Sequence, residues 1–123
     1  MNKRALGKIW EEQGCTFLKR EGCEILEKNY RSRRGEIDLI VQDGRYLVFV
    51  EVKYRKDSNT GFPEEAVDYH KQMKICRTAQ EYLLRKELPD TTPCRFDVVA
   101  VCGNIRKADR ALRLGRTGGS PQK

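Results

Sequence analysis

The sequence predicts a single domain of the α/β or α+β class, in which helices flank a mixed β-sheet. Two stretches, 6–21 and 63–88, carry apolar residues at helical spacing. Three shorter runs typical of strands, 23–30, 35–42 and 45–55, lie between them, and a fourth, 93–101, follows the second. The two central runs are close enough for an antiparallel hairpin, whereas the long helix before the last run allows a crossover to a parallel strand. The 123 residues suffice for one hydrophobic core.

The composition is that of a globular protein, with 38% hydrophobic and 35% charged residues. No apolar run approaches the ~20 residues of a membrane-spanning helix, and the Met-Asn-Lys-Arg start lacks the apolar stretch of a signal peptide. We therefore expect a cytoplasmic protein. Residues 1–103 form the expected domain, and the basic residues 104–123 with Gly118-Gly119-Ser120-Pro121 form an expected flexible tail.

Positive charge gathers at both ends of the chain, and the net charge is +7. Residues 1–34 hold nine Lys and Arg against five acids, residues 35–102 hold ten against twelve, and residues 103–123 hold six against one. A basic periphery around a mildly acidic centre suits a polyanion held over a cation-binding site. Solubility and disorder of the tail are the alternative explanation.

The cysteines do not form a recognisable framework. Their number is odd, none are spaced as Cys-x-x-C, and His70 is the only histidine. This pattern argues against a disulfide scaffold and a zinc site, and favours small buried hydrophobic residues in a reducing compartment. The five are Cys15, Cys23, Cys76, Cys94 and Cys102.

The first helix is predicted over 6–21 and ends near Gly22. Its apolar stripe consists of Leu6, Ile9, Trp10, Gln13, Gly14, Phe17 and Leu18. Glu11 lies at the border of this stripe, so it is either an ordinary surface glutamate or an acid of a functional site.

A strand over 23–30 leads into a basic turn, Arg31-Ser32-Arg33-Arg34. The guanidinium fork matches phosphate oxygens, so Arg31, Arg33 and Arg34 are candidates to bind nucleic acid. A solvated turn is the alternative.

The segment 35–55 predicts a β-hairpin, because two apolar runs of period two flank Asp43-Gly44, and Gly tolerates the positive φ of a type I′ turn. With this turn Gln42 faces Arg45, and Glu36 lies opposite Glu51. A loop longer by one residue would move one strand's side chains to the other face.

The hairpin has one apolar face and one charged face. The apolar face carries Ile37, Leu39, Val41, Tyr46, Val48, Val50 and Val52. The other face carries Glu36, Asp38, Ile40, Leu47, Phe49, Glu51 and Lys53. Unpaired buried charges are costly, so the charged groups of this face require a bound counter-charge, and a divalent cation would fit. Asp38 is diagonal to Glu51 in this register, within the ~7–8 Å reach at which both carboxylates approach one hard metal ion.

The second helix is predicted from Pro63 to the residue before Pro89, with Glu64 and Glu65 in its first turn, where the macrodipole favours acids. Its inward stripe consists of Val67, Lys71, Ile75, Thr78, Ala79 and Tyr82. Lys71 stands where an apolar residue is expected. Either its stem is buried and its amine reaches water, or its amine points at the carboxylates or at a bound phosphate.

The final strand, 93–101, is apolar on both faces and is therefore expected at a central or well-covered position. For Asp97 within it, a salt bridge to Arg95 or to a neighbouring strand is favoured over catalysis.

Asp38 followed by Glu51-Val52-Lys53 resembles the D…(E/D)-x-K signature of the PD-(D/E)XK nuclease superfamily. The fuller set of Asn29, 35–40 and 49–55 is similar to the YraN family of small bacterial proteins, and the resemblance spans Leu6 to Val101. It implies an αβββαβ restriction-endonuclease-like core. Trp10 departs from the glycine that the family pattern places before the glutamate of the first helix, which puts the close contact of that helix in doubt.

The resemblance implies a site that holds Mg²⁺ or Mn²⁺. Asp38 and Glu51 would be direct ligands, with the backbone carbonyl of Val52, and Lys53 would orient water or stabilise negative charge. Further roles are implied for Glu11 and Glu36 as outer ligands through water, for Lys71 at the site, and for Arg55 beside Arg31, Arg33 and Arg34 on nucleic acid.

Three functions follow from these observations. The first is a metal-dependent nuclease on DNA, with branched or junction DNA among its expected substrates, and junction cleavage would ask for a homodimer with two sites. The second is a non-catalytic nucleic-acid-binding protein that kept the fold. The third is a protein-interaction module, which predicts neither metal affinity nor salt-dependent binding of DNA.

Overall fold

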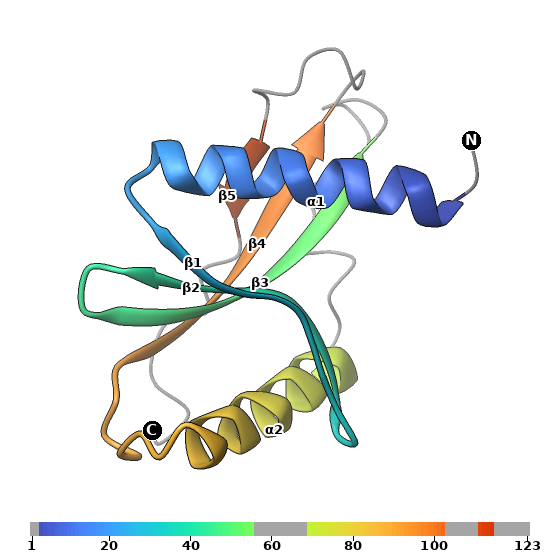
Figure 1. Ribbon diagram of the computed structural model, residues 1–123. Coiled ribbons are helices and arrows are strands. Elements are labelled where there is room, and N and C mark those ends of the chain that lie inside the picture. Colours follow the sequence, from blue (N-terminus) through green and yellow to red (C-terminus); the bar gives the residue numbers. More distant parts are fainter. Residues whose placement is uncertain (1–2, 56–68, 103–110, 115–123) are drawn as a thin grey trace.

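A five-stranded mixed sheet lies between two helices in the computed structural model, which describes residues 3–55, 69–102 and 111–114. The elements in chain order are α1 (Lys3–Arg20), β1 (Glu24–Ser32), β2 (Gly35–Asp43), β3 (Tyr46–Arg55), α2 (Tyr69–Arg85), β4 (Cys94–Cys102) and β5 (Ala111–Leu114). α1 covers one face of the sheet and α2 covers the other (Figure 1). The predicted fold class and the αβββαβ order are confirmed.

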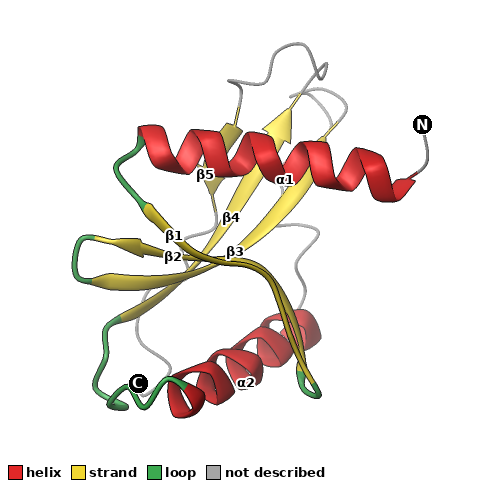
Figure 2. Cartoon of the chain, viewed as in Figure 1, coloured by secondary structure: helices red, strands yellow, loops and turns green. Residues whose placement is uncertain are grey.

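The strands follow one another across the sheet in sequence order. β1, β2 and β3 form an antiparallel meander, β3 and β4 are parallel, and β5 is antiparallel to β4 (Figure 2). The parallel pair is joined by the connection that contains α2, as the long interval between the two strands predicted. β5 was not predicted: it lies within 104–123, where weak periodicity and basic residues suggested a flexible tail.

Each face of the sheet has its own apolar cluster. The cluster under α1 has a buried centre of Cys15, Leu18, Cys23, Leu39, Val41, Val48, Val50, Val99 and Val101. The cluster under α2 consists of Tyr30, Ile37, Ile40, Leu47, Phe49, Ile75, Ala79, Tyr82, Leu83 and Cys94. Because both faces are covered, β3 and β4 are apolar on both sides.

The hairpin prediction was wrong in its register, and it assigned the apolar side chains to the correct faces except for Ile37. The pairs run from Asp43 with Tyr46 to Leu39 with Val50, so the turn residues are Gly44 and Arg45. Gly44 takes the positive φ, 62°, at the first central position, which is the pattern of a type II′ turn rather than I′. The register differs from the predicted one by two positions, which leaves the facing of the side chains unchanged.

The new register also corrects the predicted partner of Glu36. Glu36 pairs with Arg31 of β1 and does not lie opposite Glu51. The last pair of the β2–β3 ladder is Leu39 with Val50. Extending this register by one position places Asp38 across from Glu51 rather than diagonal to it.

The N-terminal part of β2, before Leu39, has no paired residue in β3 and pairs with β1 alone. Together they form a two-stranded ribbon that bends toward α2 (Figure 1). The bend moves Ile37 into the cluster under α2, whereas strict alternation placed it with Leu39 under α1. β1 also extends to Ser32, so the predicted basic turn is confined to Arg33 and Arg34.

Arg95 and Asp97 form the predicted salt bridge inside the sheet. The Arg95 Nε and Nη2 atoms donate to the two carboxylate oxygens of Asp97 at 3.0 and 2.9 Å, and Nη2 also donates to Asp43 at 2.8 Å. Asp97 has no exposed surface. Three of the described cysteines are buried as expected, but Cys76 on α2 is exposed.

The predicted start of the second helix at Pro63, with Glu64, Glu65 and Val67, lies outside the described residues. Neither α1 nor α2, the two helices of the described part, combines the length and apolar character that a membrane span requires.

Candidate functional site

The candidate site lies where β2 leaves β3, and Asp38 stands at this fork. The last pair of the ladder is Leu39 with Val50. Beyond it, the backbone N–H of Val52 donates a hydrogen bond of 2.8 Å to Oδ2 of Asp38. A side-chain oxygen thus takes the place that a carbonyl of β2 would occupy in a continued ladder, and the bond fixes the carboxylate between the two strands.

The same contact gives the direction of the Val52 carbonyl. In an extended strand the N–H and the C=O of one residue point to the same edge. The Val52 carbonyl therefore points to the β2 side, the side on which Asp38 lies. Carbonyl and carboxylate oxygens are the ligands that hard divalent cations accept.

The environment of Asp38 opposes its negative charge. Burial raises the pKa of this carboxyl from 3.8 to about 7, and the negative charge of Glu51 adds to the rise. The hydrogen bond from Val52 acts in the opposite direction, and the charges of Glu11 and Glu36 raise the pKa further. The negative charges of three acids thus oppose the ionisation of Asp38, and a cation at the fork would offset this repulsion.

Glu51 on β3 binds two lysines through one oxygen. Its Oε2 atom lies 2.8 Å from Nζ of Lys71 on α2 and 3.3 Å from Nζ of Lys53 on β3. The Glu51 side chain is 11% exposed, whereas those of Lys53 and Lys71 are 26% and 39% exposed. The amine of Lys71 thus points at the carboxylate, which is the second of the two predicted alternatives for this residue.

The two lysines differ in their acid–base properties. Burial lowers the pKa of Lys53, and the neighbouring amine of Lys71 lowers it further, against the attraction of Glu51. Burial also opposes the charge on Lys71, but hydrogen bonds to Glu51 and Lys53 outweigh it and leave the pKa of Lys71 raised. Lys71 is therefore the more firmly charged of the pair.

Glu11 and Glu36 lie around Asp38 with partners of their own. Glu11, on α1, accepts a hydrogen bond of 3.1 Å from Nδ2 of Asn29, a residue at a positive φ of 54°. Glu36 forms an ion pair of 3.7 Å with Arg31. Their negative charges contribute to the raised pKa of Asp38, but each of these two acids is engaged by another side chain.

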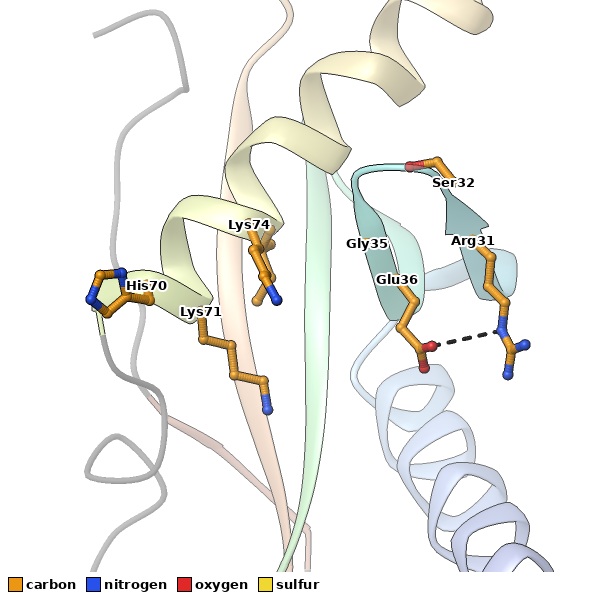
Figure 3. Close-up of a pocket in the computed structure, with 8 residues that line it drawn as sticks. Arg31, Ser32, Gly35, Glu36, His70, Lys71 and Lys74 are labelled. Carbon is orange, nitrogen blue, oxygen red and sulfur yellow. Dashed lines mark ion pairs between the residues drawn. The ribbon is translucent and has the colours of Figure 1, made fainter.

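A cavity of about 600 Å³ opens between the bent ribbon and the start of α2 (Figure 3). The side chains of Lys71 and Lys74 extend from α2 on the side that faces β2, and Arg31 and Glu36 lie across from them. His70 also lines this cavity. The sequence did not assign His70 or Lys74 to the site, although Lys74 follows Lys71 by three residues on a helix and so lies on the same face.

The predicted arginines are divided between two places. Arg31 lines the cavity beside Lys71, whereas Arg33 and Arg34 line a separate hollow of about 410 Å³ with Arg77 of α2. Arg55 is the last residue of β3, but its side chain is outside the described part of the chain.

The donor set fits a small hard cation. Within residues 3–55, 69–102 and 111–114, no three or more His, Cys, Asp or Glu side chains gather as a complete metal cage. Mg²⁺ is usually held by one or two carboxylates, with water and substrate phosphates completing the octahedron, so such a cage is not required. Asp38, Glu51 and the Val52 carbonyl provide a partial set of this kind.

Comparison with known proteins identifies relatives along most of the chain. A family model described as "Uncharacterised protein family UPF0102" matches residues 10–101. A UPF0102 protein of Lachnoclostridium phytofermentans is 50% identical over 101 residues, which cover 82% of this chain and 86% of the relative. Another from Caldicellulosiruptor saccharolyticus is 43% identical over 106 residues, covering 86% and 89%. The chain therefore belongs to the UPF0102 family, which is the YraN family that its sequence resembles.

Proposed function

We propose that this protein is a metal-dependent nuclease that hydrolyses phosphodiester bonds of DNA. The observation that carries the proposal is the proximity of Asp38 and Glu51 just beyond the last β2–β3 pair, with Lys53 and Lys71 on Glu51 and a cationic cavity beside them. Two carboxylates could hold a divalent cation, and an adjacent ammonium could stabilise the developing negative charge, which together suit metal-assisted attack on a phosphodiester.

Asp38, Glu51 and the Val52 carbonyl would hold Mg²⁺ or Mn²⁺. When bound, the cation would polarise the scissile phosphate and lower the pKa of a coordinated water. Asp38 must be ionised to serve as a ligand, and its raised pKa of about 7 sets the pH at which this becomes favourable. The hydrogen bond from Val52 would hold the carboxylate at the fork.

Lys53 would act on the reacting groups. It shares the strand and the face of Glu51, and its amine is 3.3 Å from the Glu51 carboxylate. An ammonium there stabilises the negative charge that develops on the phosphorane, and in its neutral form, which its lowered pKa favours, it accepts a hydrogen bond from the attacking water. Glu11 and Glu36 would be outer ligands, each contacting the cation through a coordinated water.

The distribution of charge supports a nucleic-acid substrate. The chain has a net charge of +7; Arg31 lines one hollow, and Arg33 and Arg34 line another. Contacts to phosphates give affinity and position without sequence specificity. This supports the expectation of DNA, including branched forms, bound through its backbone.

A second candidate function is binding of nucleic acid without catalysis. The observation that favours it is the double ion pair on Glu51, because two ammonium groups already neutralise a carboxylate that the nuclease needs as a metal ligand. Cleavage and metal binding must therefore be measured separately.

The test uses the full chain with labelled linear, single-stranded, flap and four-way-junction DNA, in Mg²⁺, Mn²⁺ or chelator. The variants are Glu51→Gln and Lys53→Met, with Glu24→Gln as the matched control, because Glu24 is an exposed acid at the start of β1. Cleavage that requires metal, persists in Glu24→Gln and disappears in both site variants supports the nuclease. Binding of DNA and Mn²⁺ without cleavage supports the second function.

A further inference from the structure

Lys71 belongs to two features at once. Its amine is 2.8 Å from Oε2 of Glu51, and its side chain also lines the cavity between the ribbon and α2. At 39% exposed it is the less enclosed of the two lysines on Glu51. Its long stem, carried by a helix rather than by the strand of Glu51, allows the amine to change partners while the backbone stays in place.

A divalent cation and the Lys71 ammonium compete for the same carboxylate. Both are positive, and both require a Glu51 oxygen. A cation held by Asp38 and Glu51 therefore gains affinity when the Lys71 ammonium moves away. Lys53 has less freedom to do so, because it projects from the same strand two residues from Glu51.

The nearest place to which the Lys71 amine can move is the cavity that it lines. Lys74 and Arg31 are also cationic there, with His70 at the edge, and Glu36 is engaged by Arg31 at 3.7 Å. Without an anion, a third cation in the cavity would meet repulsion from the other two. A phosphate group reverses this balance, since three charged donors then converge on its oxygens.

We propose that the cavity lined by Arg31, Lys71 and Lys74 binds a phosphodiester, and that Lys71 leaves Glu51 to do so. Filling the cavity thereby exposes Glu51 to the divalent cation. The inference rests on the proposed nuclease function and adds how its site is regulated: the cation binds more tightly when a phosphodiester of the DNA backbone is in place. By linkage, the cation raises the affinity for the phosphodiester by the same factor.

The experiment measures Mn²⁺ binding by the electron paramagnetic resonance signal of free Mn²⁺, with and without saturating dimethyl phosphate. This diester carries one negative charge and is a weak chelator of metal ions. In the unaltered protein, dimethyl phosphate should tighten Mn²⁺ binding at least fivefold, within the range typical of coupled sites.

Two variants isolate the role of Lys71. Lys71→Gln should bind Mn²⁺ more tightly than the unaltered protein without phosphate, and the effect of dimethyl phosphate should fall below twofold. Lys74→Gln is the matched control, because Lys74 lines the cavity but is not the lysine on Glu51. It should weaken dimethyl phosphate binding, and it should raise the Mn²⁺ affinity without phosphate by less than Lys71→Gln does.

The outcomes separate this inference from the proposed function. Coupling of equal size in Lys71→Gln would show that the phosphate acts through direct contact with the metal, and would overturn the exchange of Lys71. Mn²⁺ binding that dimethyl phosphate does not change overturns the inference and leaves the nuclease proposal in place. Failure of the unaltered protein to bind Mn²⁺ at millimolar concentration overturns both.

Discussion

The carboxylate of Asp38 accepts a 2.8 Å hydrogen bond from the backbone N–H of Val52. This bond lies immediately beyond the last backbone pair of β2 and β3, so it satisfies an N–H group that the parting strands would otherwise leave without a partner. It also places an acid with a pKa of about 7 beside Glu51. The separation of two strands therefore creates the site, and the properties of Asp38 follow from that separation.

Asp38→Asn should stabilise the protein at pH 8. The folded-state pKa of about 7 exceeds the ordinary value of 3.8, so the folded protein holds the proton more tightly, and this contribution to stability is lost as pH rises through 3.8 to 7. Asparagine stays neutral and still accepts the Val52 hydrogen bond. Urea unfolding should show near-equal stabilities at pH 4 and a gain of about 2–4 kcal/mol for the variant at pH 8.

Asp90→Asn is the control for this measurement, because Asp90 is exposed in the turn after α2. Its difference from the unaltered protein should be small and independent of pH. A difference between Asp38→Asn and the unaltered protein that is the same at pH 4 and pH 8 would contradict the raised pKa.

Affinity for Mn²⁺ should follow the ionisation of Asp38. Below pH 7 a proton competes with the metal for the carboxylate, so the affinity should rise by about tenfold per pH unit and level off above pH 7. Isothermal titration calorimetry between pH 5.5 and 8 measures this slope. Equal affinity at pH 5.5 and 8 would mean that Asp38 is not a ligand, and Asp38→Asn should lose most of the affinity at pH 8.

The position of Asp38 and Glu51 on one face was predictable because it depends on the parity of the register. Alternation along a strand keeps Asp38 on the face of Glu51 whether the turn begins at Asp43 or at Gly44. The register itself was not predictable, because the Asp43 carboxylate is bound to Arg95, 52 residues away in sequence. Local turn propensity favoured Asp43-Gly44 as the turn, but this distant contact keeps Asp43 in the strand.

The cavity could not have been predicted from periodicity. It exists because the β1–β2 ribbon bends past β3 toward α2, which brings Arg31 opposite Lys74. Nothing in the alternation of either strand specifies this bend, and the strict pattern placed Ile37 on the wrong face. The spacing of Lys71 and Lys74 on one helical face was the one available signal.

Glu51→Gln should destabilise the protein in the absence of metal. The substitution leaves the ammonium groups of Lys53 and Lys71 close together without their shared counter-charge. Because the lysines are partly exposed, we expect a loss of about 1–3 kcal/mol, less than for a fully buried pair. Urea unfolding in chelator measures it, with Glu24→Gln as control, and an unchanged stability would show that the two ion pairs contribute nothing.

Asp97→Ala should be among the most damaging substitutions in the sheet. Asp97 is fully buried and receives two hydrogen bonds from Arg95, which is itself 7% exposed. Removing one partner of a buried pair leaves an uncompensated charge and costs about 3–5 kcal/mol, although Asp43 still binds Arg95. The midpoint temperature of thermal unfolding should fall by well over 10 °C. A loss below 1 kcal/mol would mean that Asp43 alone satisfies Arg95.

Gly35→Ala should cost more than Gly44→Ala, although both glycines stand at positive φ, 153° and 62°. A Cβ at Gly35 would lie 3.1 Å from Oγ1 of Thr78, whereas one at Gly44 meets nothing within 4 Å. The hydroxyl of Thr78 is bonded to the Lys74 carbonyl at 2.8 Å, so it cannot yield freely. Gly44→Ala carries only the cost of the backbone conformation, about 1 kcal/mol, whereas Gly35→Ala should also push the ribbon away from α2.

Binding of dimethyl phosphate should therefore weaken in Gly35→Ala alone. Equal binding by both variants would show that close packing of the ribbon on α2 does not shape the cavity.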